Sequence, residues 1–454
     1  MVNLVRKTDI CSLLRLLMKK PELLAPAGNL EKLKTAITFG ADAVYLGGSK
    51  LNLRAFADNF TTEQLKEGVE FAHARGKKVY VTLNIIPHDS DLTGIEDYLR
   101  ELYELKVDAV LVADPGMMTI VKNTVPDLEI HLSTQANCLN YEAAKFWHKM
   151  GIKRVVTARE MSYEELKELR RELPDTCEIE AFVHGAMCMG FSGKCMLSNY
   201  LTGRDSNRGA CAQPCRYKYH LYEEDEHGEM HEISNNIDIL DENTNFCKDP
   251  SQKIKVVDDE SKIEIEPHGV HLMNSKDLCM IEHIPELMEC GIDSLKIEGR
   301  MKSVYYVASV VKAYRQAIDT YIKDPENYKF DPEWMDYLLK PSHRPFTTGF
   351  YFDDEVKQTY GSATYIQSYD IVGVVKEYDA ENKIATITQK NKVLNGVDVE
   401  VLEIKGENKI INLKDMRRKQ DGESIESANV PQMIFTIQCD EELKPGDILI
   451  KSKK

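Results

Sequence analysis

Several features that would suggest a function at once are missing from this chain of 454 residues. No apolar run reaches the roughly 18 residues needed to cross a bilayer, so we expect no membrane span. The motifs Gly-x-Ser-x-Gly and His-Glu-x-x-His do not occur, which disfavours the common serine hydrolases and zinc proteases. No glycine-rich phosphate loop follows the first predicted strand, which disfavours a dinucleotide-binding sheet.

Export signals are scarce as well. The apolar stretch at residues 10–17 is interrupted by Arg15, is followed by Lys19 and Lys20, and has no small-residue cleavage site after it. We therefore interpret residues 1–20 as a short N-terminal helix and expect a cytoplasmic protein. In that reducing compartment, eleven cysteines indicate metal or redox chemistry rather than a disulfide framework.

What the sequence does contain is a regular alternation of short β-rich runs and amphipathic helical runs. Most of the β-rich runs are continuously apolar, as in parallel strands that are buried on both faces. Eight such units predict an α/β fold with a closed, TIM-like (β/α)8 barrel, and an open doubly wound sheet is the alternative. The expected strands are 22–28, 43–48, 78–84, 109–114, 129–135, 154–160, 178–185 and 294–300. The expected helices are 30–39, 61–75, 91–105, 116–125, 141–150, 162–173, 277–289 and 304–322.

The regular spacing breaks once, after the seventh predicted strand. We place the barrel at residues 21–340, with a cysteine-bearing insertion at 186–270. The acidic second part of this insertion, 223–268, is interpreted as a solvated excursion that contains a hairpin. A linker is expected at 341–367. Short β-type runs separated by turn residues then predict a small antiparallel β-barrel at 368–454.

The ends of the predicted strands carry polar or charged side chains. Loops at strand ends form the open face of such a barrel, so these side chains predict a small-molecule pocket. The candidates are Glu298, His184, Arg159 and Arg300 for catalysis, with Asn84 and Gln135 for substrate binding. Glu298 with Arg300 would orient an acidic substrate or transfer a proton, and a structural ion pair is the alternative. His184 is either a base or a structural histidine.

Four cysteines follow the pattern Cys188-x6-Cys195-x15-Cys211-x3-Cys215, with glycines around them. Four thiolates are the usual ligands of a [4Fe–4S] or [2Fe–2S] cluster, and they also form tetrahedral zinc sites. Structural zinc usually shows two close Cys pairs, and only the last pair here has that spacing. We therefore favour an iron–sulfur cluster over zinc. Cys279 stays open as a substitute ligand.

A basic segment overlaps the cysteines although the net charge of the chain is −16, which disfavours nonspecific binding to a polyanion. Residues 204–218 hold four basic side chains and one acidic side chain, a local charge of +3 (4 − 1). Tyrosines beside them, such as Tyr200, suit stacking on single-stranded RNA. Alternatively, the arginines offset the charge of a thiolate-ligated cluster. The RNA-binding candidates are Arg204, Arg208 and Arg216.

Seven motifs in this chain resemble the collagenase-like peptidase family U32. They are ELLAPAG at 22–28, AVYLGG at 43–48, FVHG at 182–185, CMLS at 195–198, NRG at 207–209, CAQPCR at 211–216 and KIEGR at 296–300. The resemblance runs from about residue 21 to the C-terminus. The small C-terminal β region makes the chain most similar to the family members that act in tRNA hydroxylation.

The resemblance implies more than the spacing does. It implies that Cys188, Cys195, Cys211 and Cys215 hold the cluster. It also implies oxygen-independent hydroxylation of the wobble uridine of tRNA to 5-hydroxyuridine, with prephenate as a small carboxylated oxygen donor. In some family members a paralogous subunit is the partner. The alternatives are a U32-type peptidase and a noncatalytic subunit that binds RNA or carries a cluster.

Overall fold

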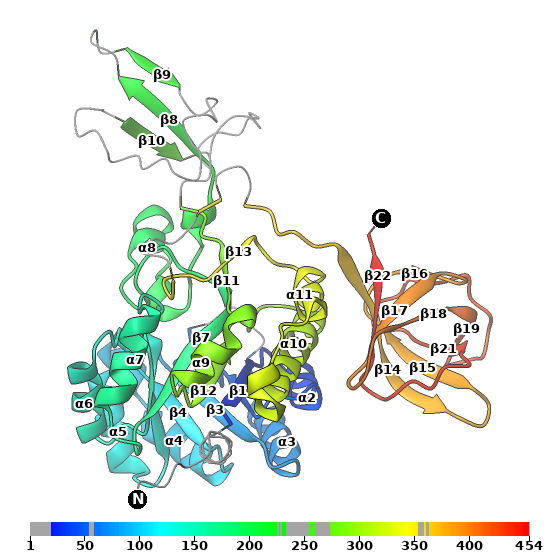
Figure 1. The fold of residues 1–454 in the computed structure, drawn as a ribbon, viewed down its shortest axis with the longest axis horizontal. Coiled ribbons are helices and arrows are strands. Elements are labelled where there is room, and N and C mark those ends of the chain that lie inside the picture. Colours follow the sequence, from blue (N-terminus) through cyan, green and yellow to red (C-terminus); the bar gives the residue numbers. More distant parts are fainter. Residues whose placement is uncertain are drawn as a thin grey trace, which may run out of the picture.

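The computed structural model describes residues 20–53, 59–224, 227, 229–232, 254–258, 273–352, 358–359 and 363–453. Apart from Lys20, the predicted N-terminal helix lies outside these residues. Figure 1 shows a barrel, a small sheet that stands off one end of it, and a β-rich C-terminal region beside it. No helix among the described residues is long and apolar enough to cross a membrane.

The predicted barrel is confirmed. Eight parallel strands pair in chain order, and the last strand pairs with both the first and the seventh, which closes the sheet. The strands are β1 (Glu22–Pro26), β2 (Ala43–Leu46), β3 (Lys78–Leu83), β4 (Ala109–Val112), β5 (Glu129–Leu132), β6 (Arg154–Val156), β7 (Glu178–Ala186) and β12 (Ser294–Ile297). Their carboxyl ends therefore form one open face, as expected for this architecture.

Helices surround this sheet, and most of the expected helices begin within a residue of the predicted start. Thr61 and Ser162 each begin a helix with a capping box, in which side chain and backbone bond reciprocally. The helices are α2 (Leu30–Thr38), α3 (Thr62–His73), α4 (Ile95–Glu104), α5 (Pro115–Thr124), α6 (Tyr141–Lys149), α7 (Tyr163–Glu172), α9 (Ile284–Glu289), α10 (Val304–Lys323) and α11 (Pro332–Leu339).

The predicted helix at 277–289 is wrong at its start. Its first residues form strand β11 (Asp277–Cys279), which pairs antiparallel with the end of β7. Pro285 lies in the first turn of α9, a place that suits proline but not the middle of a longer helix. The chain before this proline instead covers the part of β7 that extends beyond the barrel. Strand β13 (Phe346–Thr347), within the predicted linker, adds to β11 on its other side.

The interior of the barrel is charged at the amino ends of its strands, although the strands read as mainly apolar. Arg154 is almost fully buried and forms ion pairs with Glu22 (2.5 Å), Glu178 (2.7 Å) and Glu180 (3.1 Å). Lys296 pairs with Glu180 at 2.6 Å. Buried charges are tolerated when they are paired in this way. This end of the barrel therefore serves stability, and the site is to be sought at the other end.

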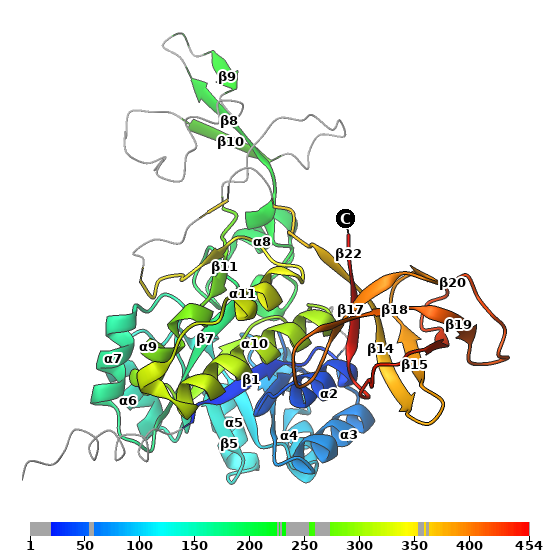
Figure 2. The ribbon, with the colours of Figure 1, turned by 45° about the vertical axis from the view of Figure 1, so that its right-hand side comes forward.

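The insertion continues from β7 into a three-stranded antiparallel sheet that stands away from the barrel in Figures 1 and 2. Its central strand is β8 (Tyr219–Glu224), which pairs with β9 (Met230–Glu232) and β10 (Ile254–Asp258). The β8–β9 pair agrees with the expected hairpin. Most of the acidic part at 223–268 lies outside the described residues.

The C-terminal region is a curled antiparallel sheet with its own hydrophobic core, which confirms the predicted small β fold. Its strands are β14 (Tyr369–Asp379), β15 (Ile384–Gln389), β17 (Asp398–Leu402), β18 (Lys409–Asn412), β19 (Lys414–Arg418), β21 (Ile434–Gln438) and β22 (Ile448–Ser452), with β16 (Val393–Leu394) and β20 (Ser427–Ala428) as a separate pair. Buried side chains of this region join the hydrophobic core of the barrel, so the two parts are packed against each other.

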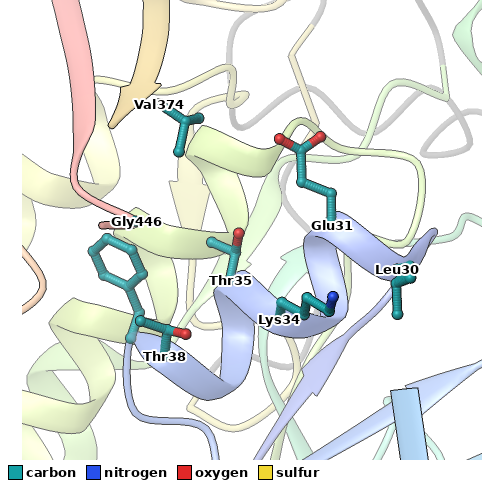
Figure 3. Close-up of a pocket in the computed structure, with 8 residues that line it drawn as sticks. Leu30, Glu31, Lys34, Thr35, Thr38, Val374 and Gly446 are labelled. Carbon is teal, nitrogen blue, oxygen red and sulfur yellow. The ribbon is translucent and has the colours of Figure 1, made fainter. Parts of the chain in front are cut away.

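Polar contacts also cross this junction. The Lys312 ammonium of α10 donates to the Gly406 carbonyl (3.0 Å) and to the Asn408 side chain (3.1 Å). Lys390 pairs with Glu31 at 2.7 Å. A groove of about 370 Å³ lies beside this contact. Figure 3 shows the residues that line it, which come from α2 and from the C-terminal region.

Candidate functional site

The structure brings Arg159 and Glu298 together at the mouth of the barrel. An Arg159 Nη2 atom lies 3.6 Å from Glu298 Oε2, and Tyr45 Oη donates to the same oxygen at 3.2 Å. Arg159 also donates to the Ala186 carbonyl (3.0 Å) and lies over the Phe182 ring, 4.1 Å from its centroid. The two charged side chains are only 10% and 15% exposed. A guanidinium held in this way can bind a carboxylate that enters the mouth.

Five buried polar atoms of residues that follow β3, β5 and β6 lack hydrogen-bond partners among the described residues. They are Asn84 Oδ1, Gln135 Oε1, Asn137 Oδ1, Arg159 Nε and Glu160 Oε2. Burial raises the pKa of the Glu160 carboxyl, which favours its protonated form. Because buried polar atoms without partners are costly, water or a ligand is expected to bind them. Asn84 and Gln135 are two of the predicted substrate-binding residues, and that role stays a prediction.

His184 and Arg300 do not join the pair. His184 is 2% exposed and packs edge-to-face against Tyr314 and Phe346. Burial, with smaller effects of Lys302 and His343, lowers the pKa of His184 to about 3, so its ring is neutral. This surrounding favours the structural interpretation of His184 over the catalytic one.

Arg300 lies on the side of β2 and β3. It is 5% exposed, and its guanidinium donates to Thr82 Oγ1 (3.2 Å) and Asn52 Oδ1 (3.1 Å). It therefore helps to fix the loop after β2. The direction of the chain after β12 explains why Arg300 lies apart from Glu298. Glu298 continues the alternation of the strand and points into the barrel. Gly299, with a φ of +149°, then changes the direction of the chain before Arg300.

The cysteine loop, which we define as residues 187–217, begins where β7 ends and contains the short helix α8 (Leu197–Thr202). It is attached to loops that follow other strands. Arg208 forms two bonds with the Asp91 carboxylate (2.5 and 2.8 Å), and Ile86 N donates to the Asn207 carbonyl at 3.1 Å. Gly193 packs so tightly on Gln135 that a Cβ atom would lie 2.6 Å from the Gln135 carbonyl oxygen. These contacts hold the loop over the mouth.

The four thiols of this loop lie near one another. Burial raises the pKa of the Cys215 thiol to about 11, and the charges of Cys188, Cys211 and Cys195 raise it further, whereas Arg216 opposes them. Gln213 N donates to Cys211 Sγ at 3.3 Å. Cys188 and Cys211 are exposed.

The described residues do not form a ready site for a single metal ion. Among the described residues, no three Cys, His, Asp or Glu side chains are close enough to hold a metal ion. A single tetrahedral zinc, with Zn–S bonds of about 2.3 Å, requires sulfur atoms roughly 3.8 Å apart. A cluster of several iron atoms separates its thiolates further. The choice between a cluster and zinc stays a prediction.

Cys279, the possible substitute ligand, lies elsewhere. It is 7% exposed in β11 and belongs to the hydrophobic core. Burial raises the pKa of its thiol to about 12. Cys279 therefore does not lie with the four cysteines of the loop.

The predicted RNA-binding arginines make contacts within the chain. Arg208 binds Asp91, and Arg216 donates to the Asn274 side chain (2.8 Å) and to the Ser275 and Met187 carbonyls. Arg204 donates to the Ala210 carbonyl at 2.9 Å. Tyr200, in contrast, is 84% exposed. A role of these arginines in RNA binding stays a prediction, and their structural role is to hold the loop.

Comparison with known proteins supports the resemblance seen in the motifs. The model of peptidase family U32 matches residues 28–361, and that of the U32 C-terminal domain matches residues 367–449. The chain belongs to peptidase family U32. It is 41% identical to tRNA hydroxylation protein P1 of Bacillus subtilis over 97% of this chain and 96% of that protein.

Two further U32 relatives carry different names. The chain is 39% identical to tRNA hydroxylation protein P of Escherichia coli, over 86% of this chain and 87% of that protein. It is also 29% identical to a protein of Porphyromonas gingivalis named collagenase, over 95% and 98% of the two chains. Membership in U32 therefore fixes the fold and the domain pair, but not one activity.

Two residues of this U32 site were missed by reasoning from the sequence. Asp91 anchors the cysteine loop through Arg208, a residue 117 places further along the chain. Tyr45 holds the Glu298 carboxylate from the end of β2. A tyrosine within an apolar strand was the available signal for the second. The first lies in a polar stretch that resembles any loop.

Proposed function

We propose that this U32 protein is an iron–sulfur enzyme that hydroxylates RNA. More narrowly, it converts the wobble uridine of tRNA to 5-hydroxyuridine without molecular oxygen and takes the oxygen from prephenate. The names of its U32 relatives support action on tRNA. The observation that supports the proposal is the cysteine loop, whose four thiols lie near one another and which directly follows Ala186, the residue whose carbonyl accepts a bond from Arg159.

The thiols of Cys188, Cys195, Cys211 and Cys215 would hold the cluster. When bound, such a cluster supplies electron transfer at the mouth. The Gln213 N–H bond to the Cys211 sulfur would stabilise a thiolate there. The Arg216 guanidinium, next to Cys215 along the chain, offsets negative charge on this group.

The Arg159 guanidinium would bind a carboxylate of the donor. Its Nε has no hydrogen-bond partner among the described residues, and its Nη2 faces Glu298 at the long distance of 3.6 Å. A donor carboxylate can therefore gain two hydrogen bonds from this side chain at little cost to the existing pair. Glu298, oriented by Tyr45, would accept a proton in the mouth.

The peptidase alternative would need a Cys–His pair such as Cys188 with His184. His184 is buried among aromatic rings, and its pKa of about 3 makes it a poor base near neutral pH. Support for this alternative comes from names alone, those of the family and of relatives such as the collagenase.

The test starts with anaerobic purification of the full-length protein and analysis of iron and sulfide. It continues with nucleoside mass spectrometry of tRNA from a deletion strain that carries the gene or a variant. We expect a brown, iron-containing protein that restores 5-hydroxyuridine. Cys215→Ser should lose both properties, whereas Cys439→Ser, a buried thiol in the C-terminal region, should keep them. An iron-free wild-type protein, or tRNA that is unchanged by the deletion, would refute the proposal.

A further inference from the structure

A second polar cluster lies beside the mouth and takes no part in the site described above. Lys302 follows β12, the eighth strand of the barrel, whereas Arg344 and Tyr365 belong to the segment between α11 and the C-terminal sheet. Loops after the seventh and eighth strands are where barrels of this type frequently bind phosphate. The cluster therefore lies where an oxyanion is expected from the architecture alone.

The three side chains form one unit around the ring of Tyr365. The Lys302 ammonium lies 3.8 Å from the ring centroid, and the Arg344 guanidinium lies 4.1 Å from it. Arg344 Nη1 also donates to Tyr365 Oη at 3.0 Å. Tyr365 is 40% exposed, so the unit reaches the surface. Two cations on one partly exposed ring form a rigid, positively charged platform.

Positive charge exceeds negative charge in this unit. Asp277 is the carboxylate that pairs with Arg344, at 3.6 Å, and it is also the carboxylate that acts on Lys302 among the described residues. Two cations thus share one carboxylate. Arg344 is 4% exposed, and its Nε atom has no hydrogen-bond partner among the described residues.

The lowered pKa of Lys302 is consistent with an excess of positive charge in this unit. Burial lowers the pKa of the Lys302 ammonium to about 8, and Arg344 lowers it further, against Asp277. An incompletely neutralised pair of cations, of which Arg344 is buried and Lys302 is half-buried, is costly, and an anion that binds beside them removes part of that cost.

The unit lies between the cysteine loop on one side and the backbone of Glu298 on the other. Gln358, in the same segment as Tyr365, donates to the Met189 sulfur, and its backbone pairs with Ser275. On the barrel side, the Tyr306 ring contacts Lys302 and its hydroxyl donates to the Glu298 carbonyl. A nucleotide whose base entered the mouth would therefore carry its backbone past Lys302.

We propose that Lys302, Arg344 and Tyr365 form a binding site for a backbone phosphate of the RNA substrate. This inference rests on the proposed action on RNA and assigns a contact that the reaction itself does not need. The exposed side chains of Met301 and Ile366 flank the platform and suit the apolar faces of a ribose or a base.

The test is the salt dependence of tRNA binding, measured with the full-length protein and tRNA that lacks the wobble modification. For a single-stranded contact, each neutralised phosphate contributes about 0.7 to the slope of log K against log salt. We expect Lys302→Gln to lower the slope by about 0.7 and to weaken binding at low salt. Lys302→Arg should retain both. The control is Lys329→Gln, an exposed lysine between α10 and α11, which should change neither.

Two results would overturn the inference while leaving the proposed function intact. The first is a Lys302→Gln protein that binds tRNA with an unchanged slope. The second is a Lys302→Gln protein with unchanged tRNA affinity but a raised KM for prephenate, which would assign the oxyanion to the donor. Failure of the wild-type protein to bind tRNA would instead refute the proposed function and the inference together.

Discussion

The contact between Gly193 and Gln135 gives the sharpest test of how the cysteine loop is held. Gly193 has a φ of +76°, and a Cβ atom there would lie 2.6 Å from the Gln135 carbonyl oxygen and 2.7 Å from its side-chain oxygen. Gly203, in the same loop, has a φ of +68°, and a Cβ atom there would have nothing within 4 Å. The two glycines therefore share the backbone requirement but differ in the space available.

Alanine at either residue costs roughly 1–2 kcal/mol for the left-handed conformation. Gly193→Ala adds an overlap with a backbone atom, and overpacking of this kind typically costs about 1–3 kcal/mol more. Since 1.4 kcal/mol is a factor of ten in an equilibrium, this additional cost is enough to displace the loop from the mouth in a large share of molecules. We expect Gly203→Ala to retain its iron and its activity, and Gly193→Ala to lose most of both.

The assay is iron and sulfide per chain after anaerobic reconstitution, together with 5-hydroxyuridine in tRNA from the complemented deletion strain. Thermal unfolding reports whether the barrel itself is intact, since the loop lies outside its core. Equal iron content and equal activity of the two variants would show that the close contact between Gly193 and Gln135 is not needed to position the cysteine loop. The reasoning about the loop would then be wrong.

Three further predictions concern the pairs that the structure reveals. Arg208→Gln and Asp91→Asn should each destabilise the loop, and a double-mutant cycle on iron retention should give a coupling of about 1 kcal/mol, because the pair is bidentate but partly exposed. Glu298→Gln should lower kcat at least about tenfold without changing the melting temperature, if the carboxylate transfers a proton; an unchanged kcat would leave it a structural role. Burial lowers the pKa of the Lys312 ammonium from 10.5 to about 8. Between these two pH values the unfolded state therefore binds more protons than the folded state. The free energy of unfolding should accordingly rise with pH from about 8 to 10.5, by up to about 3 kcal/mol. Urea unfolding at several pH values should show this rise, and Lys312→Met should abolish it.

The barrel could be predicted from the sequence because each buried parallel strand is a short apolar run followed by a helix with clear start signals. Thr61 and Ser162 mark two such starts, and both were correct. The strand β11 was missed because its residues, Asp277–Cys279, continue into a real helix after Pro285 without a break in apolar pattern. Its pairing with β7 depends on residues about ninety places away, which local pattern does not contain.

The same reasoning applies to the candidate site. Arg159 and Glu298 follow strands of known direction and lie together in the structure, whereas the sequence analysis had paired Glu298 with Arg300. The burial and the neutral state of His184 depend on Tyr314, which lies in helix α10, and on Phe346, which lies in the segment after the barrel. Likewise, the charge of Arg208 looks available for RNA until Asp91 is found beside it. Residue type and spacing therefore locate the mouth, whereas the partners of each side chain require the three-dimensional structure.

The attachment of the cysteine loop at several separate places limits how substrates can enter. Ile86 and Asp91 hold it after β3, Gln135 holds it after β5, and Arg216 ties its end to Asn274 near β11. Because the cysteine loop is attached at three places around the mouth, it cannot move away from the mouth as a rigid body. We therefore expect substrates to enter the mouth along the part of the rim that the loop leaves open, next to β12, without a large opening motion. A nucleotide would slide in sideways there, past Lys302, while the thiols stay in place above it.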